Sequence, residues 1–431
     1  MCFNVNITNI IFDKNWVNTK YFELKNVNVM KIALVCPASL PATQFGGIMF
    51  LCVNISKKLS SIGHDLTIFT TNLDFANNTN TFNKKLPKKE KVENFVIRRT
   101  NVWFSIFLFF VNPGIYKQMM KDDFDIIHAV GIRSFQAFIA AIVSKRKKIP
   151  LVISDQGGLT THPDLKESSL SKRILIRLQR PLIKFIVNQS SSVIVPNEYE
   201  KKIFLNFCDE SKISIVRNGI DVNEMKIWDS EFAKKFTNNE EFILFLGRFH
   251  EVKGIDTLLD AVNLIKKKLS LEKIKVMIMG VDFGYEEKME KIIRKFDLSD
   301  NIYIIKKPRR EDVISAYNTC KFLVLPSKWE LSPLTPLEGF ACKKTLVSTT
   351  AHGIPYTISH NENCILVPPS DPQSLSEAIL ELIKNPQRCN ELGESGFRMV
   401  LNEGNLDTMS LKIFSVYERT IKLNKGNRGK D

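Results

Sequence analysis

Short apolar runs alternate with longer helical patterns along most of this 431-residue chain, and this alternation restricts the fold more than any other feature. The apolar run at 30–35 is bounded by Pro37, and a helical pattern over 48–62 ends at Gly63, before the next run at 64–70. Such runs are typical of strands buried on both faces of a parallel sheet. The repeated strand–helix–strand order therefore predicts an α/β fold with doubly wound parallel sheets.

The alternation stops once, in a polar and irregular stretch after Asn218-Gly219, and then starts again. Further strands of the first half are expected at 124–130, 150–155, 192–197 and 212–217. In the second half we expect strands at 241–247, 274–280, 301–305, 322–326 and 344–349, and helices at 255–269, 285–296, 311–319 and 334–342. Two similar halves predict two facing Rossmann-like domains with a ligand-binding cleft between them, at the carboxyl edges of their sheets.

The resulting domain plan has four parts, and its two large domains agree with the usual size of a folding unit. Residues 30–222 form the first domain and residues 223–402 the second. Residues 403–431 are expected to form a helix that packs back on the first domain, followed by a basic tail. Residues 1–29 contain seven Asn and no clear period, so we expect a disordered extension or a misassigned start codon.

Several classes of protein are excluded by composition and spacing. With 44% hydrophobic and 25% charged residues, the chain has globular composition. Its longest apolar run, 102–111, is half the roughly 20 residues that a membrane-spanning helix needs, and the first residues lack the pattern of a signal peptide. The eight Cys contain no CxxC pair and the six His no metal-binding spacing. We therefore expect a cytoplasmic protein with reduced thiols and no metal site.

The positive charge is concentrated in the first half of the chain. Residues 30–222 have 27 Lys and Arg against 15 Asp and Glu, whereas residues 223–431 have 31 against 29. The basic clusters lie at 84–91, 98–99, 145–148 and 172–184. A surface of this kind attracts nucleic acid, anionic lipid headgroups or phosphorylated substrates; the alternative is a merely solvated, lysine-rich surface.

The most informative segment is PSKWELSPLTPLEGFAC at 326–342, in which a buried strand is followed by two carboxylates, Glu330 and Glu338. Carboxylates accept hydrogen bonds from the hydroxyl groups of a sugar or ribose. Two acids on either side of a helix start could grip polar groups that flank a bound diphosphate. The alternative is an ordinary capped helix with a solvent-facing Glu.

The start of that helix is itself a candidate phosphate site. Ser332 is a suitable N-cap, Pro333 suits the first helical position, and Pro336 remains within the first turn. The backbone amides of Leu334 and Thr335 would then lie at the positive end of the helix, where phosphate binds favourably.

This segment resembles the E-x7-E motif of the retaining glycosyltransferase family 4, which has the GT-B fold, and the resemblance covers about 30–424. FLGRFHEVKGIDTLLDAV at 245–262 resembles the donor-diphosphate segment of the family, so Arg248 and Lys253 are the implied diphosphate ligands and catalytic cations. Two cations at a strand end can neutralise a departing diphosphate. The resemblance further implies that Glu338 holds the donor ribose and that the catalytic Glu330 holds the transferred sugar.

Three motifs of the first half extend the resemblance. Gly46-Gly47 is similar to the glycine-rich loop of the family, where amides approach the donor, and the absence of GxGxxG argues against a dinucleotide dehydrogenase. DIIHAVG at 125–131 resembles the strand that ends in a sugar-facing His, so His128 is a candidate catalytic residue in the cleft. RNGID at 217–221 is similar to the hinge before the second domain.

The expected activity is therefore transfer of a sugar from a nucleotide-diphosphate co-substrate to a glycan, a lipid-linked molecule or another hydroxyl acceptor. No metal or nucleic acid is expected, and the DxD sequence at 123–125 is expected only to mark the polar start of a strand. Two alternatives stay open: a non-catalytic nucleotide-sugar-binding or scaffolding relative, and an epimerase on the same double fold.

The sequence also suggests where an acceptor could be met. The aromatic run at 103–111 follows Arg98-Arg99, and an exposed segment of this kind would suit the headgroup boundary of an anionic membrane. The alternative is that the run is a buried helix or strand. In either case the basic clusters at 84–91 and 145–148 could dock on anionic lipid, so a peripheral location at the cytoplasmic face of a membrane is expected.

Overall fold

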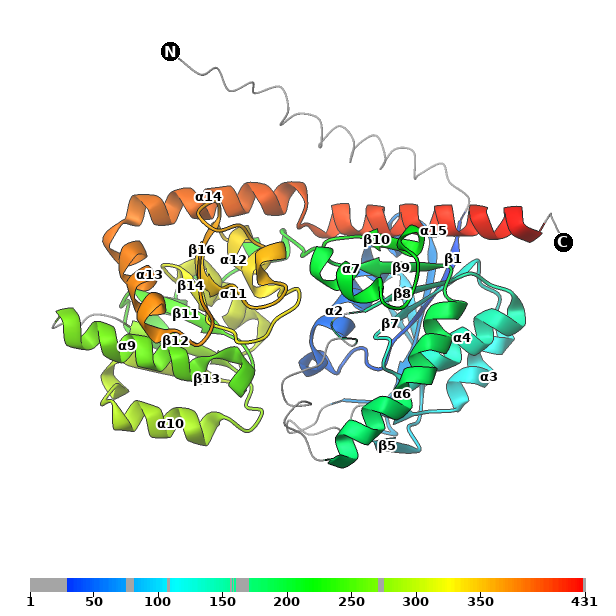
Figure 1. Cartoon of the computed structure of the whole chain (residues 1–431), viewed down its shortest axis with the longest axis horizontal. Coiled ribbons are helices and arrows are strands. Elements are labelled where there is room, and N and C mark those ends of the chain that lie inside the picture. Colours follow the sequence, from blue (N-terminus) through cyan, green and yellow to red (C-terminus); the bar gives the residue numbers. More distant parts are fainter. Residues whose placement is uncertain are drawn as a thin grey trace, which may run out of the picture. The chain divides into compact units, whose positions relative to one another are not determined.

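The computed structural model describes residues 29–74, 81–106, 109–155, 157, 159, 170–269 and 275–428. The chain separates into two compact units (Figure 1): unit 1 runs to Asn218 and resumes at Leu406, and unit 2 is Gly219–Asn405. The expected N-terminal extension, 1–29, lies outside the described residues except for its last position.

The main sheet of unit 1 has eight strands in the order β10-β9-β8-β7-β1-β2-β4-β3. Only the edge strand β3 runs antiparallel to its neighbour. The strands are β1 (Lys31–Val35), β2 (Asp65–Thr71), β3 (Lys89–Val92), β4 (Phe95–Thr100), β7 (Ile126–Val130), β8 (Leu151–Ser154), β9 (Ser192–Val195) and β10 (Ile213–Ile215).

Apolar side chains cover both faces of this sheet, as expected for buried parallel strands. In β1, Ile32 and Leu34 join one core and Ala33 and Val35 the core on the opposite face, because successive side chains of a strand point to opposite sides. The helices and helical turns of unit 1 are η2 (Thr43–Phe45), α2 (Gly47–Ser61), α3 (Gly114–Lys121), α4 (Phe135–Lys147), α6 (Leu170–Gln189), α7 (Glu198–Phe204), η4 (Glu210–Lys212) and α15 (Leu406–Arg428).

The C-terminal helix α15 is part of the core of unit 1. Leu406, Phe414 and Tyr417 are buried in the same cluster as α2 and one face of the sheet. Phe414 stacks on His64 with ring centroids 4.5 Å apart, and Thr420 shares a hydrogen bond with Ser192 at the start of β9. The last segment of the chain therefore closes one face of the first sheet (Figure 1).

The described residues of the aromatic run at 103–111 form no helix; they form two short strands, of which the first is exposed and the second is partly buried. These strands are β5 (Phe104–Ile106) and β6 (Phe109–Val111), which pair with each other as a separate two-stranded antiparallel sheet. Trp103, Phe104 and Ile106 are exposed, whereas Phe110 is fully buried. The neighbouring cations differ from expectation too: Arg99 is only 2% exposed and pairs with Glu90, so it is not a surface charge.

Unit 2 has a six-stranded, entirely parallel sheet in the order β13-β12-β11-β14-β15-β16. In chain order this is 3-2-1-4-5-6, the arrangement of the Rossmann fold. The strands are β11 (Phe242–Leu246), β12 (Lys275–Gly280), β13 (Ile302–Lys306), β14 (Leu323–Leu325), β15 (Leu346–Thr349) and β16 (Cys364–Val367).

Helices cover both faces of this second sheet (Figure 1). In β11, Ile243 and Phe245 belong to one core, and Phe242 and Leu244 to the other. The helices and turns are η5 (Glu224–Lys226), α8 (Phe232–Thr237), η6 (Glu251–Lys253), α9 (Ile255–Leu269), α10 (Glu286–Lys295), η7 (Ser299–Asn301), α11 (Arg310–Thr319), α12 (Thr335–Ala341), η8 (Ile354–Tyr356), α13 (Pro372–Lys384) and α14 (Pro386–Asn402).

Within the described part of the chain, none of the helices combines the length and the apolar character that crossing a bilayer would require. The seven cysteines of that part, which exclude Cys2, are all free.

Candidate functional site

The candidate site of unit 2 lies where the strand order of its sheet reverses. From β11 the next strands in the chain, β12 and β13, add to one side of the sheet, and from β14 the strands β15 and β16 add to the other side. Ligands of doubly wound folds bind outside the carboxyl ends of the two strands at such a point. Arg248 and Lys253 follow the carboxyl end of β11, and Glu330 and Glu338 follow that of β14. The topology therefore gathers these four predicted residues at one edge of the sheet.

Two glycines let the loops of this edge come together. Gly254 has a positive φ of 70°, and a Cβ atom at this position would lie 2.0 Å from the carbonyl oxygen of Pro326, at the end of β14. Gly353 donates its backbone N–H to the carbonyl oxygen of Glu330, and a Cβ atom there would lie 1.8 Å from the carbonyl oxygen of Leu331. Any larger side chain would push these loops apart.

Lys253 and Glu330 form an ion pair through Lys253 Nζ and Glu330 Oε1. Both side chains are largely buried, with 14% and 13% of their surfaces exposed. Ser327 Oγ lies 3.4 Å from the same carboxylate oxygen. Partial burial strengthens the attraction between opposite charges, so the pair fixes a cation and a hydroxyl acceptor side by side at the sheet edge.

Arg248 lies on the same loop but does not join this pair. Its side chain is exposed, and its guanidinium carbon lies 5.1 Å from the ring centroid of Phe283, on the loop after β12. Two backbone hydrogen bonds connect the two loops: the N–H of Phe283 donates to the carbonyl oxygen of Phe249, and the N–H of Phe249 donates to that of Val281. The cation–π contact orients the guanidinium while leaving its N–H donors accessible to an anion.

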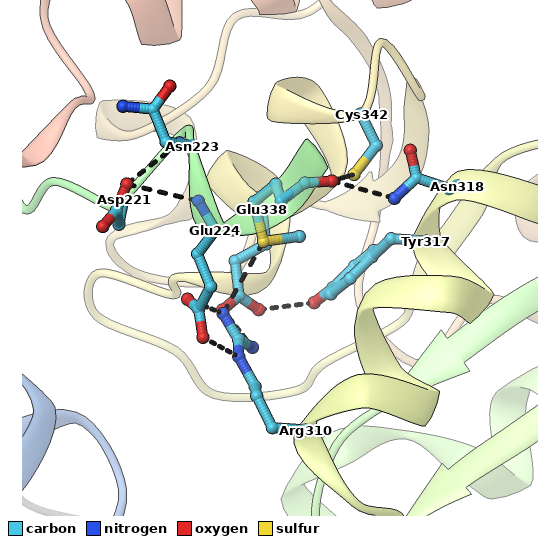
Figure 2. A network of polar contacts seen from close by, with 9 residues as sticks. Asp221, Asn223, Glu224, Arg310, Tyr317, Asn318, Glu338 and Cys342 are labelled. Carbon is cyan, nitrogen blue, oxygen red and sulfur yellow. Dashed lines mark hydrogen bonds and ion pairs between the residues drawn. The ribbon is translucent and has the colours of Figure 1, made fainter. Parts of the chain in front are cut away.

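Glu338 is held by two residues that the sequence interpretation did not identify (Figure 2). Tyr317 Oη donates a hydrogen bond to Glu338 Oε2 at 2.7 Å, and Arg310 Nη1 lies 2.7 Å from Oε1. Burial and the nearby charge of Glu338 raise the pKa of Tyr317 well above its usual value, so the phenol stays protonated and donates. A carboxylate has about four acceptor positions, and each oxygen keeps capacity for a further hydroxyl group.

Arg310 also binds Glu224 through two parallel hydrogen bonds of 3.0 and 2.9 Å. Burial alone would lower the pKa of Arg310, but the charges of Glu338 and Glu224 outweigh it and raise the pKa. The carbonyl oxygen of Met225 accepts a hydrogen bond of 3.0 Å from Asn318 of α11. The first residues of unit 2 are thus tied to α11, the helix whose Arg310 and Tyr317 hold Glu338.

The helix after β14 begins later than the sequence predicts. The expected N-cap was Ser332, but α12 begins at Thr335 and its N-cap is Leu334. Pro333 therefore precedes the helix instead of occupying its first position, and Pro336 occupies the second helical position. Leu334 and Thr335 are partly buried at this N-terminus, and Glu338 lies within the first turn.

In unit 1, Gly46 and Gly47 follow strand β1 in the chain. Strand β1 lies between β7 and β2, where the strand order of that sheet also reverses. Gly46 is the N-cap of α2, with φ of 86° and ψ of −143°, a backbone conformation that L-residues rarely adopt. Both glycines therefore lie at the start of a helix of 15 residues, Gly46 as its N-cap and Gly47 as its first residue.

The expectation that His128 faces a substrate is wrong. His128 lies in the middle of β7 and is fully buried. Nδ1 lies 2.6 Å from Tyr417 Oη of α15, and Nε2 lies 2.6 Å from Ser154 Oγ at the end of β8. Both ring nitrogens are therefore engaged within the core, and the imidazole has a structural role.

This environment makes a prediction about pH. Burial lowers the pKa of His128 to about 3, whereas the unfolded chain takes up a proton near pH 6.5. Between these pH values the unfolded state binds more protons than the folded state. The contribution of His128 to the free energy of unfolding is therefore fully present above pH 6.5 and is lost as the pH falls. From pH 7.5 to pH 5 this residue should remove about 2 kcal/mol from the free energy of unfolding. Urea unfolding at both pH values should show a smaller loss for His128→Gln, and an equal loss in variant and wild type would contradict this assignment.

Both carboxylates of the DxD sequence have partners within unit 1. Asp125 Oδ2 accepts a hydrogen bond of 2.7 Å from the backbone N–H of Lys31 at the start of β1. Asp123 pairs with Lys147, and the hydrogen bond and charge of this lysine lower the pKa of Asp123. Among the described residues there is no group of three or more His, Cys, Asp or Glu placed to hold a metal ion.

Solved structures with the same fold define the class of this protein. Sucrose-phosphate synthase of Thermosynechococcus elongatus superimposes with a TM-score of 0.72 at 16% identity, covering 91% of this chain and all of that one. HepE of Anabaena, solved in complex with UDP, gives a TM-score of 0.69 at 18% identity, covering 90% of this chain and all of that one. The two Rossmann-like domains are those of the GT-B glycosyltransferases.

Sequence comparison then gives the family. Residues 226–399 match the family model "Glycosyl transferases group 1", and residues 45–224 match "Glycosyltransferase Family 4". The chain belongs to the group 1 glycosyltransferases of family 4. It is 27% identical over 267 residues to an uncharacterized glycosyltransferase of Methanocaldococcus jannaschii, covering 61% of this chain and 66% of that one. It is 20% identical over 463 residues to D-inositol 3-phosphate glycosyltransferase of Kineococcus radiotolerans, covering 94% of this chain and 99% of that one.

Proposed function

We propose that this protein is a retaining, metal-independent glycosyltransferase that transfers a sugar from a nucleoside-diphosphate sugar to a hydroxyl acceptor. The observation that carries the proposal is the Lys253–Glu330 pair at the point where the strand order of unit 2 reverses. In this pair, Lys253 supplies positive charge for a departing diphosphate, and Glu330 supplies an acceptor for the hydroxyl groups of a sugar. That a relative of the same fold was solved with UDP agrees with a nucleotide-sugar donor.

Each residue then has a distinct task in the proposed reaction. As the bond between the sugar and the diphosphate breaks, negative charge grows on the diphosphate, and Lys253 and Arg248 neutralise it. Glu330 accepts hydrogen bonds from the transferred sugar. Glu338, held by Arg310 and Tyr317, accepts the ribose hydroxyl groups, while the amides of Leu334 and Thr335 in unit 2 and of Gly46 and Gly47 in unit 1 contact the donor.

The proposed acceptor is a glycan or a lipid-linked molecule. The free, dispersed cysteines of the described part agree with a reducing compartment, and we propose a cytoplasmic enzyme that works at the cytoplasmic membrane face. The net charge of +12 on residues 30–222 supports an anionic partner for the first domain.

The decisive experiment measures donor turnover and product stereochemistry together. The protein is incubated with UDP-, GDP- and ADP-sugars, with and without hydroxyl acceptors, and the anomeric configuration of the product is read by NMR. Acceptor-dependent release of the nucleoside diphosphate with retention is the expected result. Binding without turnover would instead indicate a non-catalytic relative, and conversion of the donor sugar without an acceptor would indicate an epimerase.

We expect this turnover to persist in EDTA. Two basic side chains, Lys253 and Arg248, can supply the charge that a divalent ion would otherwise provide, and both carboxylates of the DxD sequence already have partners. Initial rates should agree within experimental error with and without the chelator. Complete loss of activity in EDTA and its recovery with manganese would overturn the metal-independent mechanism.

A further inference from the structure

The β5–β6 hairpin of unit 1 presents an apolar face that the rest of the unit covers only in part: Phe109 packs edge-on against Phe135 of α4, whereas the β5 side of the face is exposed. Its register places Phe104 opposite Val111 and Ile106 opposite Phe109. Residues directly opposite each other share a face of the sheet, so all four side chains on this face are apolar. Phe104 is 54% exposed and Ile106 is 46% exposed, and the adjacent Trp103 is 74% exposed. An antiparallel sheet normally turns polar residues toward water.

The hairpin is firmly attached through its other face and its ends. Phe110 is fully buried, and Gln136 of α4 donates a hydrogen bond of 2.8 Å to its carbonyl oxygen. The backbone N–H of Val102 donates to Asn72 Oδ1, and that of Trp103 to the carbonyl oxygen of Val111. The exposed aromatic side chains therefore belong to an anchored element at the edge of unit 1 (Figure 1), and their exposure does not come from a loose loop.

A cluster of lysines lies near the start of this hairpin, because Asn72 accepts hydrogen bonds from the backbone N–H groups of both Asn83 and Val102. Phe82 packs edge-on against Phe110 with ring centroids 5.3 Å apart, which places the segment after Phe82 beside the hairpin. Lys84, Lys85 and Lys88 follow within this segment and are exposed. The acids near this segment are Asp74 and Glu90, and Glu90 pairs with the buried Arg99, so the three exposed lysines outnumber them. Positive charge thus predominates around the apolar side chains.

We propose that Trp103, Phe104 and Ile106 insert into the headgroup region of an anionic bilayer while Lys84, Lys85 and Lys88 contact its lipid phosphates. Tryptophan and phenylalanine are favoured at this depth of a membrane. Each nearby lysine adds attraction to anionic lipid that salt screens. The surface is independent of the donor site in unit 2, so its test does not depend on the proposed transferase activity.

The test is co-sedimentation of the full chain with vesicles of phosphatidylcholine, with or without phosphatidylglycerol. The wild type should bind the phosphatidylglycerol vesicles at low salt and be released at high salt. The partition coefficient should fall about tenfold or more for Phe104→Thr combined with Ile106→Thr, which keep β-branched or strand-compatible side chains. It should also fall about tenfold for Lys84→Glu combined with Lys85→Glu. Trp103→Phe should keep binding but lose the vesicle-induced blue shift of tryptophan emission.

Matched controls lie elsewhere in the chain. Ile227 and Trp228 of unit 2 are 78% and 44% exposed, so changing both to Thr removes comparable apolar surface. Lys384→Glu combined with Lys412→Glu reverses the same number of exposed charges. Both controls should bind vesicles as the wild type does. Absence of wild-type binding, equal binding by the hairpin variants, or concentration-dependent self-association that Phe104→Thr abolishes would each overturn the proposal.

Discussion

Replacing Lys253 by alanine should lower the turnover of the nucleotide sugar by about 100- to 1,000-fold. The ammonium group is the cation nearest to Glu330 at the edge of the sheet, and without it the departing diphosphate loses charge compensation in a partly dehydrated site. Arg248→Ala should also reduce turnover, because the second cation acts on the same group. The kcat of both variants is measured at a saturating concentration of the donor, so that a change in binding alone is not mistaken for a change in chemistry.

A matched control for this prediction lies two residues from Glu330. Lys328 pairs with Asp256 at 2.7 Å and is 26% exposed, so Lys328→Ala removes a cation of the same loop that points to a different carboxylate. Its turnover should remain within about threefold of the wild type. Near-normal turnover in both Lys253→Ala and Arg248→Ala would show that the diphosphate binds elsewhere.

Glu330→Ala and Glu338→Ala should separate sugar transfer from nucleotide binding. Glu338→Ala should weaken the binding of free nucleoside diphosphate by about tenfold to 100-fold, because the ribose hydroxyl groups lose a charged acceptor and Arg310 loses one of its two carboxylates. Glu330→Ala should leave that affinity nearly unchanged and reduce transfer by about 100-fold. Calorimetric titration with the nucleotide and steady-state assays measure the two quantities separately.

The control variants for this pair test positioning. Tyr317→Phe keeps the buried ring and removes one hydrogen bond to Glu338, so it should weaken nucleotide binding by about fivefold. Glu241→Ala removes a glutamate that is 74% exposed and pairs with Lys321, and it should change nothing. If Glu338→Ala binds the free nucleotide as tightly as the wild type does, the ribose assignment is wrong.

Most strands of the two main sheets could be predicted because they are short apolar runs buried on both faces of a sheet. The sequence analysis did not predict β3, β4 or β16, and charged residues interrupt the apolar pattern in β3 (KEKV) and β4 (FVIRRT). The alternation within β7 could also have placed His128 correctly. His128 shares a face with Ile126 and Val130, and both are members of the core beneath α15, so the pattern already indicates a buried side chain. The resemblance to a family motif outweighed this local signal. An exposed aromatic segment at 103–111 was one of two predicted alternatives, but its pairing as a β-hairpin was not predicted, because the run lacks the alternation of polar and apolar residues that marks a surface strand.

The site was only partly predictable because its partners are distant in sequence. The loops after β11 and β14 follow strands that the apolar pattern identifies, and the motif residues Lys253 and Glu330 meet there. Arg310 lies 86 residues from Glu224, and no local pattern links the two. The residue types of Ser332 and Pro333 suggest a helix start at that point, whereas α12 begins at Thr335 with Leu334 as its N-cap.

The return of α15 to unit 1 has a consequence for modularity. Unit 2 is one continuous segment, Gly219–Asn405, joined to unit 1 by two peptide connections, whereas unit 1 is assembled from two segments. A fragment ending at Asn218 would lack Phe414 and Tyr417, would expose one face of its sheet and would leave His128 without a partner for Nδ1. Gene fusion or recombination can therefore exchange unit 2 as a single cassette, but unit 1 can be inherited intact only when both ends of the chain travel together.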